Sequence, residues 1–184
     1  MTMGLIMLKN KLATATLGIV LILAAGLSSA ADIRLVRFGP AGEEKPGLID
    51  AQNQIRDLSA HVTDITPDQL SDEALEEISQ IPISQLPAVP GSPRIGVPLT
   101  GIGKIVAIGF NYVNHAAEMA VDLPIEPLVF MKAISALTGP FDNIIQPRNG
   151  NKLDYESELV IVIGKRAQYI SEEEVFDHIA GFTV

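Results

Sequence analysis

The sequence contains no cysteine and relatively few basic residues. Disulfide bonds are therefore excluded, although a chain of this length can bury a core without them. For that reason the absence of cysteine does not decide the compartment. Acidic residues outnumber basic residues by 22 to 13, and there is no run of lysines or arginines. This charge balance argues against a nucleic-acid-binding groove.

Signatures of two common enzyme classes are also missing from the sequence. There is no G-x-S-x-G segment, and the order of serines, aspartates and histidines matches no serine-hydrolase pattern. Gly101-Ile-Gly103 could suggest a dinucleotide-binding turn, but these glycines precede an expected strand instead of following one. His61 and His178 lie in polar or acidic stretches, which favours solvent-exposed side chains.

The first 31 residues have the three-part pattern of a secretory signal peptide. Lys9 and Lys11 form a positive region, residues 12–27 are uncharged and apolar, and small residues before Asp32 permit cleavage after Ala30 or Ala31. The apolar run is short for a membrane span, which needs about 20 residues. We expect export to the periplasm or the medium, without stable membrane association after cleavage. An uncleaved leader that anchors the protein in the membrane is the alternative.

Proline and glycine divide the chain behind the leader into three regions. Residues 32–80 are typical of a small N-terminal α/β domain, in which Thr66-Pro67 and Gln69 mark a helix start. Residues 81–103 contain five prolines and indicate an extended linker, because proline interrupts both helices and strands. Residues 104–184 form the third region, which is rich in expected strands.

Local patterns predict the elements within these regions. The expected strands are 32–38, 45–50, 54–58, 104–109, 128–130, 143–145 and 155–163, and a further one begins at residue 182. Helices are expected from Thr66 to Ile78, over 111–120, and after a capping box formed by Ser171 and Glu174. The predicted fold class is therefore α+β with a majority of strands.

Glu156 and Glu158 stand two residues apart at the start of the longest expected strand. Side chains at this spacing in a strand point to the same face, roughly 7 Å apart at their Cα atoms. Two carboxylates this close favour a shared proton or a cation between them. A hard divalent metal such as Mg²⁺ suits an all-oxygen site. A solvated sheet face that simply carries both glutamates is the other interpretation.

Three further residues are candidates for proton transfer or charge stabilisation. His115 and Glu118 share one face of an expected helix, an arrangement that can fix the tautomer of a general base. An ordinary surface pair has the same spacing. Lys132 follows an apolar strand and could stabilise an anionic substrate, or it could be a solvated strand end.

Three blocks of the sequence together resemble the fumarylacetoacetate hydrolase (FAH) family. They are residues 104–118 with N-Y-x-x-H-x-x-E, residues 126–132, and residues 154–165 with D-Y-E-x-E-L. Residues 32–55 look like the N-terminal domain found in many bacterial members. The resemblance implies an FAH-type mixed β-sandwich roll, of which this chain carries the first half, behind the small N-terminal α/β domain.

The resemblance also implies a role for each candidate residue. Family members bind Mg²⁺ or Mn²⁺ through a Glu-x-Glu pair, here Glu156 and Glu158, and a later aspartate. The dyad of the family corresponds to His115 and Glu118, and Lys132 matches a recurring active-site lysine. We therefore expect a full-length parent enzyme that is a homodimer and acts on a small 2-oxo acid or β-diketo acid.

The implied chemistry is cleavage or rearrangement of a C–C or C–N bond next to a metal-chelated 2-oxo group. Within the family this covers acylpyruvate hydrolase, 2-oxo-hepta-ene-dioate isomerase or hydratase, oxaloacetate decarboxylase and ureidoglycolate lyase types. In the family, the third metal ligand lies just beyond the position of Val184, so we expect the fragment to be inactive alone. Two alternatives remain. One is a degenerate member acting at most as a binding module, and the other is a structural β-rich domain whose acidic pair is only a surface feature.

The leader generates the first testable prediction. In fractionated cells we expect the protein in the periplasm or medium, with a mature N-terminus at Ala31 or Asp32, because the leader has the features that a signal peptidase recognises. Mass spectrometry of the purified protein measures the N-terminus. Recovery of the uncleaved chain from the cytosol would contradict the export hypothesis.

Overall fold

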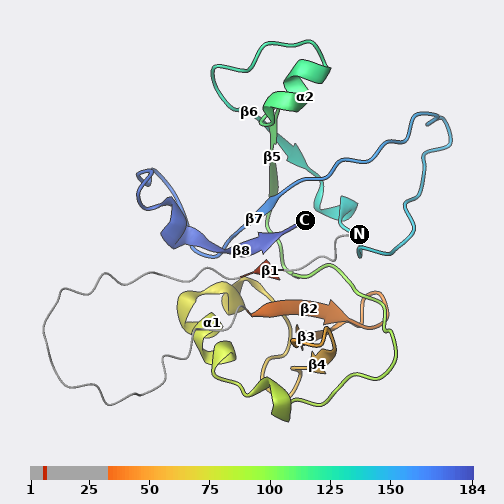
Figure 1. Ribbon diagram of the computed structural model, residues 1–184, viewed down its shortest axis with the longest axis vertical. Coiled ribbons are helices and arrows are strands. Elements are labelled where there is room, and N and C mark those ends of the chain that lie inside the picture. The colour runs from red at the N-terminus through yellow and green to blue at the C-terminus, as the bar shows by residue number, and fades with distance from the viewer. Residues whose placement is uncertain (1–5, 8–32) are drawn as a thin grey trace, which may run out of the picture. The chain divides into compact units, whose positions relative to one another are not determined.

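The computed structural model describes residues 6–7 and 33–184, and almost all of the predicted leader lies outside these residues (Figure 1). The chain divides into two compact units. One unit combines the chain up to Thr100 with Gly139–Val184, and the other is Gly101–Thr138. Every strand pair in the described residues is antiparallel. The β-rich character expected from sequence is therefore confirmed, while the mixed sandwich roll and the domain boundaries stay predictions.

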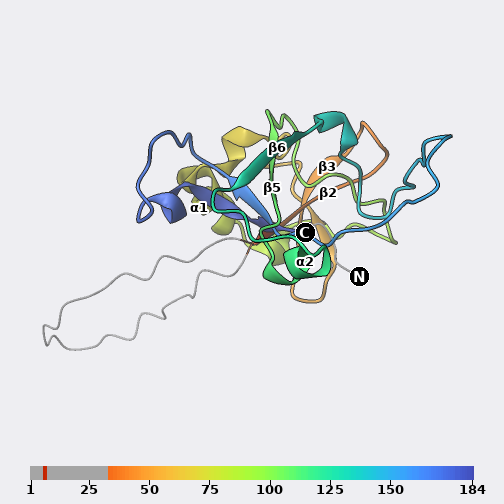
Figure 2. The same cartoon turned by 90° about the horizontal axis from the view of Figure 1, so that it is seen from above.

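A six-stranded sheet organises the first unit. Its strands are arranged in the order β4-β3-β2-β1-β8-β7. Their bounds are β1 Ile6–Met7, β2 Arg34–Phe38, β3 Lys45–Ile49, β4 Ile55–Asp57, β7 Val160–Ile163 and β8 Ile179–Thr183. Figures 1 and 2 show β2 and β3 side by side, in the register that sets Leu35 opposite Leu48. The three strands predicted between residues 32 and 58 are thus confirmed, and they pair in chain order as an antiparallel meander.

The tight turn between β3 and β4 depends on Asp50. One carboxylate oxygen of Asp50 accepts hydrogen bonds from the backbone N–H groups of Gln52 (2.9 Å) and Gln54 (2.8 Å). The other accepts one from Nε of Arg56 at 2.8 Å. Asn53 takes the left-handed conformation within this turn, with φ of 60°, a conformation that asparagine tolerates well. Asp50 therefore closes the hairpin through three bonds to one buried carboxylate.

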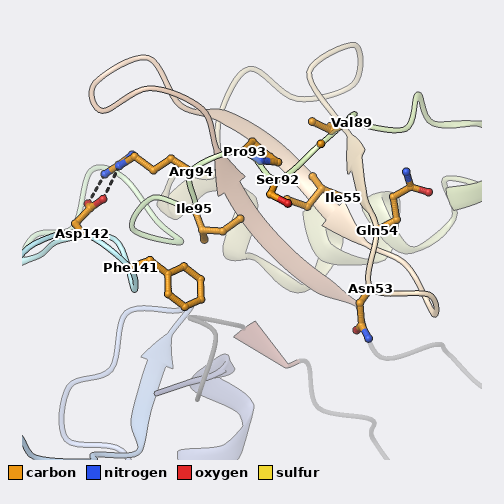
Figure 3. A pocket seen from close by; sticks show the side chains of 11 residues that line it. Asn53, Gln54, Ile55, Val89, Ser92, Pro93, Arg94, Ile95, Phe141 and Asp142 are labelled. Carbon is orange, nitrogen blue, oxygen red and sulfur yellow. Dashed lines mark hydrogen bonds and ion pairs between the residues drawn. The ribbon is translucent and has the colours of Figure 1, made fainter.

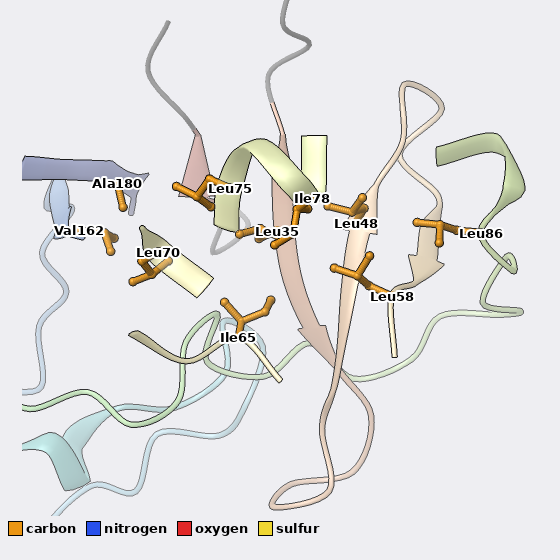
Figure 4. Close-up of a cluster of buried hydrophobic side chains, with 10 residues drawn as sticks. All are labelled: Leu35, Leu48, Leu58, Ile65, Leu70, Leu75, Ile78, Leu86, Val162 and Ala180. Carbon is orange, nitrogen blue, oxygen red and sulfur yellow. The ribbon is translucent and has the colours of Figure 1, made fainter. Parts of the chain in front are cut away.

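Helix α1 (Asp72–Ser79) covers the sheet with an apolar face. The capping pair Thr66 and Gln69 opens a 3₁₀ helix, Pro67–Leu70, rather than the α-helix itself, which begins one turn later with Ser71 as its N-cap. Figure 4 shows the cluster that results, in which Val162 and Ala180 from the end of the chain join side chains of the N-terminal region. Its buried members are Leu35, Leu48, Leu58, Ile65, Leu70, Leu75, Ile78, Leu86, Val162 and Ala180.

The second unit is a two-stranded hairpin that carries a short helix. Strand β5 (Ile105–Gly109) pairs with β6 (Leu128–Lys132), and α2 (Val113–Glu118) lies in the connection between them. A 3₁₀ helix, Ile134–Ala136, follows β6. Expectations for the strands and the helix in this region are confirmed. However, β6 is exposed along its whole length, and β5 alternates between half-buried and exposed residues.

Three expectations for the end of the chain were wrong. Residues 143–145 form no strand, and the strand expected over 155–163 is regular only from Val160 to Ile163. The register explains the second case: β8 pairs Thr183 with Val160, so the residues before Leu159 have no facing strand. The segment after Ser171 forms only a 3₁₀ helix, Val175–His178, because its acidic, exposed residues offer no apolar face to pack.

One short element completes the description. A 3₁₀ helix, Ile83–Gln85, interrupts the proline-rich stretch. Within the described residues, no helix is long and apolar enough to cross a membrane.

Core packing predicts the effect of one substitution. Leu35→Ala should destabilise the protein by about 2–5 kcal/mol, because it empties part of the fully buried cluster around β2. Val129→Ala in exposed β6 should change the free energy of unfolding by less than about 0.5 kcal/mol. Urea-induced unfolding followed by circular dichroism measures both. Equal effects of the two substitutions would contradict the position assigned to Leu35.

Acid stability provides a second prediction for this unit. The backbone hydrogen bond from Gln54, together with Arg56, holds the pKa of Asp50 below its ordinary value. The unfolded chain therefore binds the proton more readily, so the contribution of Asp50 is present above about pH 4 and is lost as the pH falls below that value. Asp50→Asn should be less stable at pH 7 and should lose less stability between pH 5 and pH 3 than the unsubstituted protein.

Unfolding curves at pH 7, 5, 4 and 3 measure this dependence. Asp68→Asn, at an exposed position, is the matched control and should follow the unsubstituted protein throughout. A parallel loss of stability in Asp50→Asn and the unsubstituted protein would show that the hairpin carboxylate does not contribute.

Candidate functional site

The five residues predicted as site residues fall into two groups that belong to different compact units. His115, Glu118 and Lys132 lie in the hairpin unit, and Glu156 and Glu158 lie in the unit of the six-stranded sheet. The geometry within each group follows from its own local structure.

His115 and Glu118 lie on α2, which places them on one face. The distance between Nδ1 of His115 and Oε2 of Glu118 is 4.0 Å, at the outer limit of an ion pair and too long for a hydrogen bond. The side chains are 47% and 81% exposed. Glu118 therefore faces the Nδ1 side of the imidazole, and this leaves Nε2 as the nitrogen that can meet a substrate or water.

Phe110 contributes to the position of this histidine. The rings of Phe110 and His115 stack with their centroids 5.5 Å apart and an angle of 22° between the planes. Phe110 lies between β5 and α2 with φ of 50°, a left-handed conformation that costs a bulky residue free energy. The sequence interpretation did not include Phe110. The only signal was an aromatic residue directly after the strand-ending Gly109.

The end of α2 repeats this unusual backbone conformation. Ala120 has φ of 52°, and the N–H of Val121 donates to the carbonyl of Ala116 at 3.0 Å, which closes the helix. Backbone with positive φ thus flanks both ends of the helix that carries the dyad. Such conformations occur often at functional sites.

Lys132 ends β6 opposite Ile105 and is exposed. Its Nζ lies 5.7 Å from the centroid of the Phe130 ring, within the range of a cation–π contact. This contact holds the ammonium group on the same face of the strand as Phe130, since the two residues are two positions apart.

Glu156 and Glu158 lie in residues 151–159, which have no regular secondary structure and are exposed. The pleat that was expected to align them on one face is therefore absent here. Their oxygen donors suit a hard divalent cation, but the described residues contain no group of three or more His, Cys, Asp or Glu arranged to hold a metal. The pair can supply at most two of the protein ligands of such a site.

The first unit contains a cavity of about 490 Å³ that involves none of the five residues (Figure 3). Its wall combines the apolar side chains Ile55, Val89, Ile95 and Phe141 with the polar side chains Asn53, Gln54, Ser92, Arg94 and Asp142, together with Gly91 and Pro93. Arg94 does not present a free charge there, because Asp142 and Glu44 pair with it.

Comparison with known proteins identifies the class of this chain. Residues 104–184 match the family model for the fumarylacetoacetate hydrolase C-terminal domain. All five predicted site residues lie within that range. Residues 104–184 are therefore similar to the C-terminal domain of the fumarylacetoacetate hydrolase family.

Particular relatives refine this assignment. The chain is 46% identical, over 152 residues, to a 2,4-didehydro-3-deoxy-L-rhamnonate hydrolase of Sphingomonas sp. (strain SKA58), covering 83% of this chain and 52% of the relative. The structure of this chain resembles a fumarylacetoacetate hydrolase from Exiguobacterium antarcticum, with a TM-score of 0.64 and 27% identity. The match covers 82% of this chain and 53% of that one. A solved structure from Mycobacterium smegmatis, at 23% identity and a TM-score of 0.59, supports the fold alone. The chain spans about half the length of the relatives it matches.

The stacked pair generates a prediction for the site. In Phe110→Leu, we expect the ring-current shift of the His115 Hε1 proton to disappear, because a leucine side chain has no ring current. Proton NMR of the imidazole region measures this shift, and the sequence has only three histidines to assign. His61 and His178 serve as internal controls. An unchanged His115 signal would contradict the stacking.

Proposed function

We propose that this chain is part of a metal-dependent hydrolase that acts on a small 2-oxo or 2,4-dioxo acid. The observation that supports this most is the coincidence of all five predicted site residues with the range matched by the family model. The Sphingomonas relative is named for an acid that is didehydro at carbons 2 and 4. That name describes a β-diketo acid, the substrate class that the sequence resemblance implies.

In this proposal the hairpin unit moves the proton. Glu118 lies on the Nδ1 side of the His115 imidazole and would orient the ring by moving within hydrogen-bond distance of Nδ1, while Nε2 accepts a proton from an attacking water or from substrate. Phe110 restricts the ring orientation by stacking. Lys132 provides a fixed positive charge for a substrate carboxylate or a developing oxyanion. The stacked His115 ring and the Lys132 ammonium group would thus be in position before substrate binds.

Glu156 and Glu158 would hold Mg²⁺ or Mn²⁺, since both offer carboxylate oxygens on one short segment. The bound cation would polarise the substrate oxygens and stabilise the enolate that forms when the C–C bond breaks. The specific reaction type within the family, hydrolase or lyase, depends on substrate contacts beyond these five residues.

We propose further that the full-length parent is a homodimer and that this chain alone has no turnover. Exposed apolar side chains support the second point. In the described residues, every large apolar side chain with an exposed surface lies at Val106 or beyond, in the range of the family domain. Soluble monomers rarely expose this much apolar surface. An exported protein, periplasmic or secreted, remains our proposal for its location.

Metal titration tests the proposed function. The chain should bind Mn²⁺, and Glu156→Gln should weaken that binding by about tenfold, because half of the carboxylate pair is lost. The electron paramagnetic resonance signal of free Mn²⁺ measures binding. Glu172→Gln, at an exposed position in an acidic segment, is the matched control and should bind as the unsubstituted chain does. Equal binding by all three would favour the alternative, a structural module whose acidic pair lies on the surface and binds no metal.

A further inference from the structure

The segment that carries Glu156 and Glu158 lacks regular structure, yet both of its ends contact the N-terminal region of the same unit. Residues 143–159 have neither helix nor strand. A metal-binding pair on such a segment needs its position fixed from outside, because ligands must be held close to their productive geometry. The contacts at the two ends are of the same kind: a glycine against a backbone carbonyl, next to an ion pair.

The first contact is made by the turn Gly139–Asp142. Arg94 donates to both carboxylate oxygens of Asp142, from Nε at 2.7 Å and from Nη2 at 2.6 Å, as Figure 3 shows. The two side chains are only 27% and 24% exposed, and paired geometry of this kind is stronger than a single-point surface ion pair. A Cβ atom at Gly139 would collide with the carbonyl oxygen of Ile95. The turn therefore approaches the N-terminal region as closely as its backbone allows.

Arg94 is itself held in place on the sheet. Its carbonyl accepts a hydrogen bond from the N–H of Gly39 at 2.9 Å, and Phe38 and Ile95 form a β-bridge at the end of β2. Nη1 of Arg94 also donates to Oε1 of Glu44 at 2.7 Å. Burial alone would raise the pKa of Glu44, but the hydrogen bond from Arg94 and further contacts hold this pKa below its ordinary value. The guanidinium is thus oriented before it meets Asp142.

The second contact lies just behind β7. Nζ of Lys165 is 2.5 Å from Oδ2 of Asp72 at the start of α1. A Cβ atom at Gly164 would lie 2.5 Å from the carbonyl oxygen of Leu70, closer than real Cβ contacts. Val162 and Ala180 add apolar packing to Leu70 and its neighbours in the same cluster.

We infer that the N-terminal region is a two-point clamp that positions the Glu156/Glu158 pair, with Arg94 and Asp142 as positioning residues at the first point and Asp72 and Lys165 at the second. This inference rests on the proposed metal-binding function. It gives the N-terminal region a role in the site to which it contributes no ligand. Glycine at positions 139 and 164 is what allows the close approach at both points.

A distance measurement without metal tests the clamp directly. Because the chain has no cysteine, spin labels at Glu77→Cys on α1 and Ser157→Cys between the two glutamates report a single distance distribution by pulsed electron paramagnetic resonance. Asp142→Asn should broaden this distribution, because it removes the charge that Arg94 pairs with. Arg34→Gln is the matched control, since Arg34 bonds within the sheet to Asn53 and Asp50. Its distribution should equal that of the doubly labelled parent.

Metal binding in the unlabelled chain provides the second readout. Asp142→Asn should weaken Mn²⁺ binding about fivefold without touching a ligand, while Arg34→Gln should leave it unchanged. Thermal unfolding of both variants separates a local effect from a general loss of stability. The double variant Asp142→Asn/Glu156→Gln should bind no more weakly than Glu156→Gln alone, because positioning matters only for an intact pair.

The outcomes separate the clamp from the proposed function. A broadened distribution with no Glu156-dependent Mn²⁺ binding in the parent would overturn the metal function and leave the clamp standing. An unchanged distribution in Asp142→Asn would overturn the clamp, whatever the metal data. If Asp142→Asn broadens the distance distribution but binds Mn²⁺ as tightly as the unsubstituted chain does through Glu156, the positioning role is also overturned.

Discussion

A β-strand persists only where a neighbouring strand completes its backbone hydrogen bonds, and this requirement decides where regular structure ends in the first unit. The ladder between β7 and β8 has its last pair at Val160 and Thr183. The acidic residues on the N-terminal side of Val160 therefore take no orientation from a pleat. In the clamp that we infer, their position depends on contacts at the ends of their segment, where Asp142 and Lys165 pair with residues of the N-terminal region.

The meander and the first helix could be predicted from sequence because their signals are local. Alternating residues near Arg34 and the Thr66-Pro67 start need only neighbours a few positions away. The strand expected from Tyr155 is regular only from Val160, because among the described residues no strand pairs with the residues before that point. A period-two pattern states which faces a strand would have, and says nothing about whether a second strand lies beside it.

For the candidate site, the sequence identified the residues with reactive side chains but not the residues that hold them in position. His115 and Glu118 were predictable from helical spacing. Phe110 was not, because its stacking requires a left-handed backbone that no local preference of phenylalanine favours. The pairing of Arg94 with Asp142 spans 48 residues, and only the folded chain brings these charges together. Supports of this kind depend on tertiary structure, so a single sequence seldom reveals them.

Strand β1 has a consequence for the sheet as a whole. Its two residues pair with β2 on one side and, at Met7 and Phe182, with β8 on the other. In the strand order of the described residues it lies between the N-terminal meander and the β8–β7 pair and joins them. Ile6 and Met7 lie inside the predicted leader, so cleavage by a signal peptidase would split one sheet into two and uncover an edge on each. Export would then create two unpaired edges, at β2 and β8, each able to accept a new strand.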